Sequence, residues 1–121
     1  MSTSDSAVSI HPYFKVAEGK LEEAHAFCEK CVAATTTEPG CLHYGFSFLG
    51  NEAHCRESYA NAEGLLAHLD NVGALLGEFL ETCATLERLE IHGAEAELAK
   101  LREPLAHLSL KFFTLEYGFR N

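Results

Sequence analysis

The feature of the sequence that most constrains the fold is a pair of strand-like segments, 41–49 and 53–59, that lies between two helical patterns. A Gly-Asn turn separates the two segments, and this arrangement is typical of a β-hairpin. A third strand-like segment, 8–16, comes before the first helical pattern, and a fourth, 84–93, follows the second. The order β-α-β-β-α-β predicts a ferredoxin-like α+β fold with an antiparallel sheet.

The two helical patterns repeat apolar residues at spacings of three and four, so each is expected to bury one face. The first pattern runs from residue 20 to about 36 and stops at TTTEPG, where proline and glycine disfavour a helix. In the second, Asn61 is expected to cap the N-terminus, and Gly73 to bend the helix or to end its first segment. A short helix over 94–105 and a last strand over 108–119 are expected to follow.

Both faces of the predicted strands carry apolar residues. One face is expected to pack against the two main helices, and the other would then remain as a large exposed apolar patch, which monomers rarely tolerate. Two copies whose sheets face each other would cover that patch, so we expect a homodimer. Pro12 lies in the first strand and cannot donate a ladder hydrogen bond, so we expect this strand at an edge of the sheet or bulged near its start.

The length and charge of the chain exclude several classes of protein. Its 121 residues fit one domain, which we place at 8–121 after a disordered tail at 1–7. The 9 basic and 18 acidic residues give a net charge of -9, which argues against binding to nucleic acid or to an anionic membrane surface. No apolar run is long enough to cross a bilayer, and the first residues do not form a secretory signal. Because the first residues do not form a secretory signal and the number of cysteines, five, is odd, we expect a cytoplasmic protein with reduced thiols.

The motif CEKC places Cys28 and Cys31 three residues apart, inside the first helical pattern. A redox pair usually lies where a helix begins, because the helix N-terminus lowers the pKa of a thiol. Here both thiols fall on the apolar face, and the other three cysteines form no second pair at the spacing of zinc ligands. We therefore interpret the cysteines as buried free thiols.

The segments EPGCLHY and ESY, the latter leading into AEGLLAHL, resemble the antibiotic biosynthesis monooxygenase family of dimeric α+β barrels. The resemblance covers residues 8–93. Residues 38–41 match a Glu-Pro-Gly-Cys turn of that family, and 67–69 match an Ala-His-Leu element on a helix. Glu57 and Tyr59 match a strand motif in which many members have tryptophan at the second position. The resemblance implies a dimeric α+β barrel, in a family that includes quinone-forming oxygenases and haem-degrading enzymes.

The chain departs from that family in two respects. It has no tryptophan, whereas quinone-forming and haem-degrading members commonly use one in the pocket. Many members carry a second histidine three or four residues after the first, but positions 71 and 72 are Asn and Val here. The chain therefore lacks the histidine that would bind iron in a haem-degrading member, and we expect no metal and no cofactor.

Three hypotheses describe His68, which lies beside the apolar stripe of the second helical pattern. As a structural residue, it would hydrogen-bond to Glu57 on the neighbouring strand and hold the helix in register. As a catalytic residue, it would take a proton from a substrate whose phenolate or enolate then reacts with oxygen, since histidine titrates near neutrality. As a metal or haem ligand, it lacks a partner, because no two of the seven histidines form a pair at ligand spacing.

The catalytic hypothesis assigns roles to polar neighbours of this histidine. Glu57 would orient the imidazole, Tyr59 would donate to the substrate oxygen, and Asn71 would supply an amide donor. Tyr44 and His43 alternate along the second strand, so they point to opposite faces and either would line the substrate pocket.

The sequence thus predicts a cofactor-independent monooxygenase that oxidises a small aromatic or quinol-like substrate with molecular oxygen. The alternative is a non-catalytic dimeric barrel that binds a small hydrophobic ligand. The pocket separates the two, because an enzyme needs a solvent-connected cavity with convergent polar groups. In a purely structural barrel, we expect phenylalanine side chains to fill that space, from Phe46, Phe48, Phe112 or Phe113.

Overall fold

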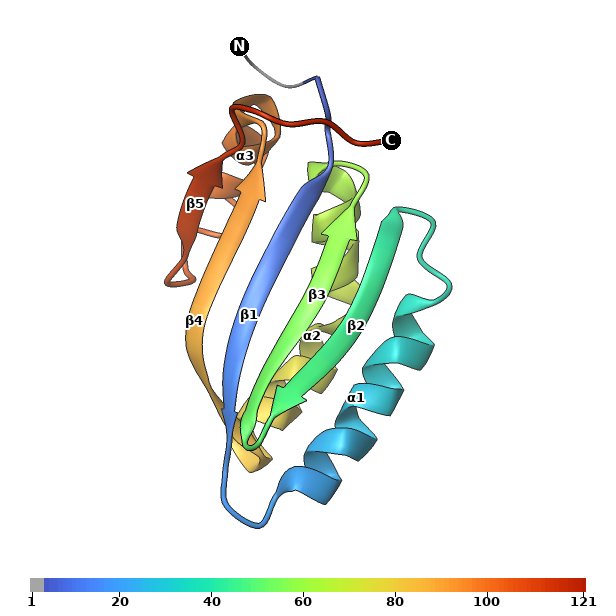
Figure 1. Cartoon of the computed structure of the whole chain (residues 1–121), viewed down its shortest axis with the longest axis vertical. Helices are drawn as coiled ribbons and strands as arrows, with labels where there is room; N and C mark the ends of the chain where they lie inside the picture. The colour runs from blue at the N-terminus through green and yellow to red at the C-terminus, as the bar shows by residue number, and fades with distance from the viewer. Residues whose placement is uncertain (1–3) are drawn as a thin grey trace.

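The computed structural model describes residues 4–121, and Figure 1 shows its elements in chain order. The elements of this part of the chain are β1 (Val8–Val16), α1 (Leu21–Thr35), β2 (Cys41–Leu49), β3 (Glu52–Tyr59), α2 (Ala62–Thr82), β4 (Ala84–Gly93), α3 (Glu95–Arg102) and β5 (Lys111–Thr114).

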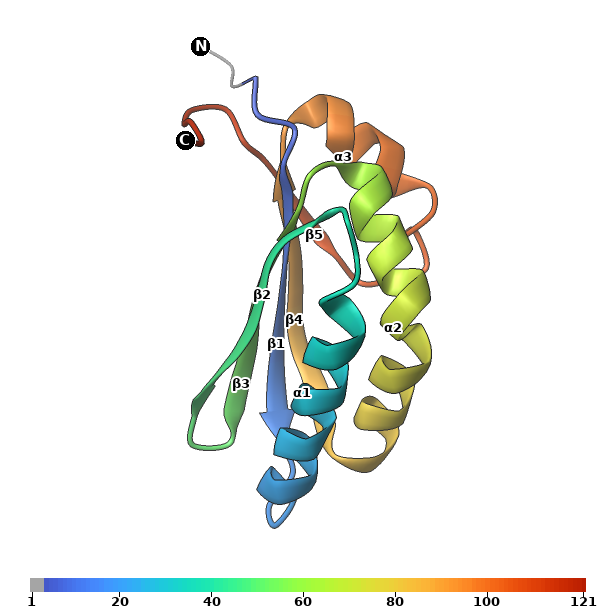
Figure 2. The same cartoon turned by 90° about the vertical axis from the view of Figure 1, so that its right-hand side faces the viewer.

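The strands form one sheet in the order β2-β3-β1-β4-β5. The pairs among the first four strands are antiparallel, and β5 is added parallel to β4. All three helices lie on the same side of the sheet (Figure 2). This confirms the predicted ferredoxin-like α+β fold. The sheet ends at β2 and β5 and does not close, so a barrel would need a second copy, and the dimeric barrel stays a prediction.

Strand β1 lies in the middle of the sheet, between β3 and β4. The prediction that Pro12 places this strand at an edge is therefore wrong. The alternative, a bulge near the start of the strand, is met in part: the register of β1 against β4 shifts between Tyr13 and Phe14, in the second half of the strand. On the side of β3, the ladder pairs pass from Ile10 directly to Tyr13, so the pairing is interrupted at the proline, which has no N–H to donate.

Helix α2 begins where the sequence predicts, since the side chain of Asn61 accepts a hydrogen bond of 2.9 Å from the N–H of Gly64. Gly73 does not end a first helical segment, since the helix continues to Thr82, so that part of the prediction is wrong and the bend stays a prediction. Val72 and Phe79, on either side of the glycine, are almost completely buried. Their burial outweighs the cost of about 1 kcal/mol that a glycine adds inside a helix.

The C-terminal elements are shorter than predicted. Helix α3 stops at Arg102, two residues before the proline that was expected to end it, and β5 spans Lys111–Thr114 in place of 108–119. Strand β5 can pair only with β4, because it lies at the edge of the sheet. The N–H of Leu115 still donates a hydrogen bond of 2.7 Å to the carbonyl of Gly93, and the chain after it is not part of a strand.

The face of the sheet opposite the helices is polar, so the expected apolar patch is wrong. His11 contacts the rings of both His54 and His92, and Tyr13 contacts His54 as well. The guanidinium of Arg88 lies 4.4 Å from the centre of the Tyr13 ring. The predicted dimer loses the support of that patch and stays a prediction.

Residues 1–3 of the predicted disordered tail, 1–7, lie outside the described residues. Within the rest of that segment, the hydroxyl of Ser6 donates a hydrogen bond of 2.7 Å to the carbonyl of Ala60. Within residues 4–121, every helix is too short or too polar to cross a membrane.

Candidate functional site

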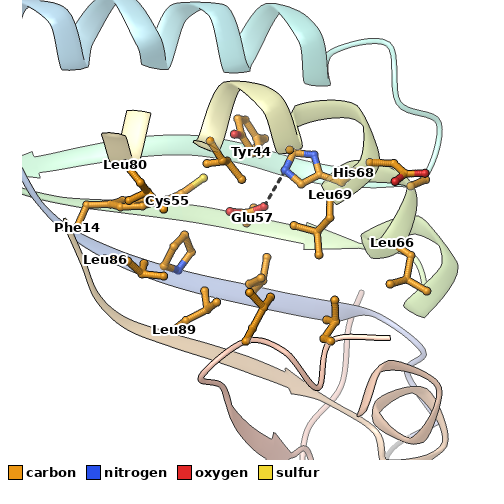
Figure 3. A pocket seen from close by; sticks show the side chains of 18 of the residues that line it. Phe14, Tyr44, Cys55, Glu57, Leu66, His68, Leu69, Leu80, Leu86 and Leu89 are labelled. Atoms are coloured by element: carbon orange, nitrogen blue, oxygen red, sulfur yellow. Dashed lines mark ion pairs between the residues drawn. The ribbon is translucent and has the colours of Figure 1, made fainter. Parts of the chain in front are cut away.

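A cavity of about 650 Å³ opens between the sheet, helix α2 and the segment that follows α3. Figure 3 shows side chains from β1, β2, β3, β4 and α2 pointing into it. Its wall is mostly apolar, and leucines dominate. The apolar residues of the wall are Ile10, Pro12, Phe14, Phe46, Leu66, Ala67, Leu69, Leu76, Leu80, Leu86, Leu89, Pro104, Leu105 and Leu108. Ionisable side chains also line it, among them Glu57 and His68. A cavity of this size and polarity suits a small, largely apolar molecule that presents a polar group.

Glu57 is a buried carboxyl in the wall of this cavity. Alternation along β3 turns Cys55, Glu57 and Tyr59 towards the helices, and the Glu57 side chain is only 5% exposed. The hydroxyl of Tyr59 donates a hydrogen bond of 2.5 Å to Oε1 of Glu57. Burial raises the pKa of Glu57 to about 7, although hydrogen bonds from Tyr59 and Cys55 act in the opposite direction. This carboxyl therefore takes up and releases a proton near neutral pH.

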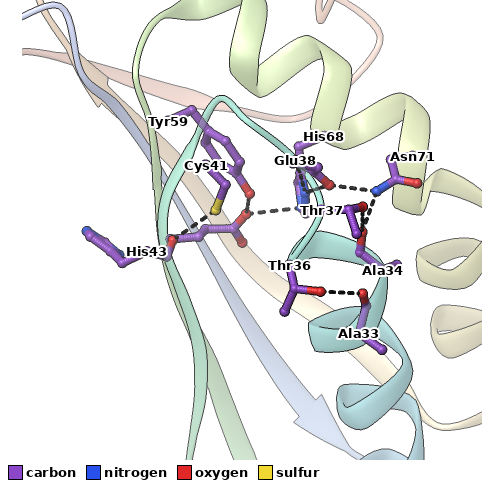
Figure 4. Close-up of polar contacts among 11 residues, drawn as sticks. Ala33, Ala34, Thr36, Thr37, Glu38, Cys41, His43, Tyr59, His68 and Asn71 are labelled. Carbon is purple, nitrogen blue, oxygen red and sulfur yellow. Dashed lines mark hydrogen bonds and ion pairs between the residues drawn. The ribbon is translucent and has the colours of Figure 1, made fainter.

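His68 lies between two carboxyl groups. It shares the buried face of α2 with Leu65 and Val72, and its side chain is 2% exposed. Its Nε2 atom is 3.3 Å from Oε1 of Glu57, and its Nδ1 atom is 2.9 Å from Oε2 of Glu38 (Figures 3 and 4). Burial lowers the pKa of His68, while the hydrogen bond and charge of Glu38 raise it in part. The contact that the sequence predicts between His68 and Glu57 is present.

Glu38 comes from the turn after α1, and the structure shows why this turn reaches His68. A Cβ atom on Gly40 would lie 3.1 Å from the Cα atom of Gly64, so two glycines allow the turn to approach the start of α2. Asn71 then holds the carboxylate, since its Nδ2 donates to Oε2 of Glu38 at 2.7 Å and to the carbonyl of Ala34 at 3.0 Å. From the sequence, Glu38 was predicted only as part of a turn motif, and its contact with His68 was missed.

The structure brings together some of the predicted site residues and separates others. His68, Glu57 and Tyr44 line the cavity, and the Tyr44 ring lies 5.2 Å from the imidazole. Tyr59 does not line the cavity, and its hydroxyl donates a hydrogen bond to the Glu57 carboxyl. His43 and Asn71 do not line it.

His43 and Asn71 are kept out of the cavity by the directions in which their side chains point. Nε2 of His43 forms a hydrogen bond of 2.9 Å with the hydroxyl of Ser58, on the face of the sheet away from the helices. Asn71 points from α2 towards the turn after α1 (Figure 4). Neither residue can contact a molecule in this cavity without rearrangement, so the substrate-binding roles predicted for them do not fit it.

The cysteines and histidines offer little to a metal ion. Among residues 4–121, no group of three or more His, Cys, Asp or Glu side chains is placed to hold one. The thiols of Cys28 and Cys31 are free and buried, as predicted from the helical pattern. Burial raises their pKa values to about 12 and about 11, so both stay protonated and unreactive.

The fold and the site define the protein as a ferredoxin-like α+β protein with a Glu–His–Glu cluster beside an apolar cavity. It belongs to the same family as MupZ from Pseudomonas fluorescens, whose crystal structure is 45% identical in sequence. That match covers 95% of this chain and 94% of MupZ, with a TM-score of 0.90. No protein-family model and no curated protein matches the chain.

Two shorter proteins share the fold at lower identity. One is a protein of unknown function from Bacteroides thetaiotaomicron, described as a candidate oxidoreductase, with 25% identity and a TM-score of 0.64 over 73% of this chain and 97% of its own. The other is a candidate antibiotic biosynthesis monooxygenase from Chloroflexus aurantiacus, with 18% identity and a TM-score of 0.59 over 71% of this chain and 90% of its own. The second likeness supports the α+β fold of the single chain, and the dimeric barrel that the resemblance implied stays a prediction.

Proposed function

We propose that this protein is an enzyme that binds a small aromatic or quinol-like molecule in the cavity and oxidises it with molecular oxygen, without a cofactor. One observation carries the proposal. Glu57 is a carboxyl with a pKa of about 7, and it lies in the wall of an apolar cavity of about 650 Å³. A general base performs best when its pKa is close to the working pH.

Proton removal is the step that such a reaction requires from the protein. A phenol or quinol becomes electron-rich enough to react with oxygen when it loses its proton, and no metal is needed for that. Ionised Glu57 would take the proton from the substrate hydroxyl, and His68 would share it across the 3.3 Å contact. The leucine-rich wall would hold the ring and exclude water, which strengthens the electrostatic interactions inside the site.

The oxidation balances without an added reductant. In an anthrone-type substrate, the CH₂ carbon activated by the neighbouring anion becomes a carbonyl that contains one atom of O₂. The two hydrogen atoms removed from that carbon leave with the second oxygen atom as water. The descriptions of the Bacteroides and Chloroflexus proteins, as candidate oxidoreductase and candidate monooxygenase, favour this class of reaction.

A second candidate function is proton transfer that uses no oxygen, such as an isomerisation or the addition of a hydroxyl group. The observation that favours it is the site itself, since Glu57 and His68 act on protons and no group in the wall is specific for oxygen. The same carboxyl and imidazole would then serve as acid and base towards the substrate.

A protein that only binds an apolar ligand fits less well. Of the four phenylalanines that would fill the space in a purely structural barrel, only Phe46 lines the cavity, and the cavity is open. Burying the Glu57 carboxyl and the His68 imidazole in its wall costs desolvation energy that an apolar ligand does not require.

Oxygen consumption tests the proposal. Purified protein is mixed with a panel of hydroquinones, phenols and anthrone-type substrates in an oxygen electrode, and products are analysed by mass spectrometry under ¹⁸O₂. With the anthrone-type substrates we expect oxygen uptake with incorporation of one labelled oxygen atom, whereas a hydroquinone would give the quinone and hydrogen peroxide without incorporated label. In Glu57→Gln we expect a fall in rate on the order of 10²-fold or more. Glu63→Gln, on the exposed side of α2, is the matched control and should behave like the wild type.

The outcomes separate the two candidate functions. Uptake that persists in Glu57→Gln at the wild-type rate would show that the reaction does not depend on this site. If no substrate consumes oxygen, the panel is repeated in D₂O without oxygen, and deuterium incorporation that needs Glu57 would replace the oxygenase by the second candidate.

A further inference from the structure

We propose that Glu38 is a positioning residue that fixes the tautomer of His68, so that the proton of the neutral imidazole stays on Nδ1 and Nε2 faces Glu57 as an acceptor. This inference rests on the proposed use of Glu57 and His68 in proton transfer. It concerns a residue that lies outside the wall of the cavity and was not among the predicted site residues.

The three side chains form a line across the protein. Glu57 comes from β3 and lines the cavity, His68 comes from α2, and Glu38 comes from the turn after α1. Glu38 is the most exposed of the three at 10%, compared with 5% for Glu57 and 2% for His68. The line therefore runs from the cavity towards the less deeply buried Glu38, with the imidazole in the middle; Figure 3 shows the contact of His68 with Glu57, and Figure 4 its contact with Glu38.

The distances favour a proton on Nδ1. A neutral imidazole donates from one nitrogen and accepts at the other. Nδ1 has both oxygens of Glu38 within hydrogen-bond distance, at 2.9 and 3.1 Å. Nε2 has a longer contact of 3.3 Å, to an oxygen of Glu57 that already accepts the hydroxyl of Tyr59. The stronger acceptor thus lies at Nδ1, and it holds the proton there.

The other groups that face His68 do not compete for this proton. From β2, Tyr44 packs against the ring, and from β3, Tyr59 does so at 4.9 Å. Burial raises the pKa of both tyrosines, so both remain neutral. The groups that set the charge around the imidazole are therefore the two carboxyls, Glu38 and Glu57.

This tautomer completes the proton transfer from the cavity. When Glu57 has taken a proton from the substrate, its O–H bond breaks and an N–H bond forms at the free Nε2 of His68. The imidazolium that results carries a proton on each nitrogen and lies against the Glu38 carboxylate, which stabilises its charge. With the opposite tautomer, Nε2 would already hold a proton and could not accept one.

Asn71 keeps the carboxylate of Glu38 aimed at Nδ1. Its amide bridges Oε2 of Glu38 and the carbonyl of Ala34 at the end of α1. Side chains that orient a catalytic histidine are themselves commonly held by such contacts. This is the role that the structure offers Asn71 in place of the substrate contact expected from the sequence.

The tautomer is measured directly by NMR of protein labelled with ¹⁵N in histidine, without substrate, at a pH above the titration of His68. Two-bond ¹H–¹⁵N spectra distinguish the two tautomers, and we expect the wild type to carry its proton on Nδ1. Glu38→Gln keeps an oxygen acceptor at this place and should keep the tautomer. Glu38→Ala removes the acceptor and should move the proton to Nε2, where Glu57 accepts it.

The kinetic readout accompanies the spectra. We expect Glu38→Ala to lower kcat on the order of 10²-fold with little change in KM, since Glu38 does not line the cavity. A wild-type proton on Nε2 would overturn the proposal without any variant, even if Glu38→Ala failed to fold. An unchanged kcat in a Glu38→Ala protein whose tautomer has switched would also overturn it. A tautomer that follows these expectations in a protein with no oxygen uptake would instead count against the proposed oxygenase alone.

Discussion

Replacing Glu57 by glutamine should change how the stability of the protein depends on pH. The pKa of this carboxyl rises from its ordinary value of 4.5 to about 7 on folding, mainly because it is buried. The folded chain therefore holds a proton that the unfolded chain has already released between these two pH values. A group of this kind favours the folded state below about pH 4.5 and loses that contribution as the pH rises through about 7.

The size of the effect follows from proton linkage. Each pH unit over which only the folded state holds the proton removes about 1.4 kcal/mol from the free energy of unfolding. Raising the pH from about 5 to about 8 crosses most of this interval, so the Glu57 contribution falls by about 2 to 3 kcal/mol. In Glu57→Gln this loss should be absent, because glutamine has the same shape and does not titrate.

Urea unfolding followed by far-ultraviolet circular dichroism measures this difference at the two pH values. His68, whose pKa is lowered by burial, titrates in both proteins and largely cancels when the two are compared. Glu63→Gln serves again as the control and should follow the wild type. Wild type and Glu57→Gln that lose the same free energy between the two pH values would refute the reasoning, since Glu57 would then not be a carboxyl with a raised pKa.

Three further changes test the packing around the site. Gly77→Ala should raise the free energy of unfolding by about 1 kcal/mol, since α2 is continuous there and a Cβ atom would meet nothing within 4 Å; a loss in urea unfolding would contradict this. Gly40→Ala should lower it by about 1 kcal/mol and shift the NMR signals of His68, because its Cβ atom would press on Gly64 and push the turn away from α2. Leu69→Trp should fill part of the cavity and raise KM tenfold or more, which corresponds to a loss of binding free energy on the order of 1.4 kcal/mol. An unchanged KM would show that the substrate binds elsewhere.

Local patterns were sufficient to predict most of the fold. The helical spacing and the cap at Asn61 depend on neighbours in sequence, and both appear as predicted. Gly73 and Pro12 were misjudged because their usual local effects are overridden here. The burial of α2 against the sheet keeps the helix continuous at the glycine, and β1 stays central in spite of the proline because it pairs with strands on both sides.

The site was only partly predictable from the sequence, because some of the residues that meet in it are far apart along the chain. Glu57 and His68 lie on a strand and on the helix that follows it, so their contact could be inferred from adjacency. Glu38 is 30 residues before His68, and its contact depends on the close approach of Gly40 and Gly64. A single sequence gives no signal for such an approach beyond the two glycines themselves, so Asn71 was assigned to the cavity while its true partner was missed.

The energetic cost of this cluster argues that it serves chemistry as well as structure. Two carboxyls and an imidazole, each no more than 10% exposed, lie together where a set of apolar side chains would pack with less desolvation. A single hydrogen bond between α2 and β3 would be enough to hold the helix in register, and it would not require Glu57 to open onto the cavity. The pKa of the Glu57 carboxyl is raised to about 7 where Glu57 and His68 together interrupt the apolar wall. A proton acceptor poised at neutral pH and facing a space for a small molecule is what acid–base catalysis requires, whichever of the two candidate reactions the substrate undergoes.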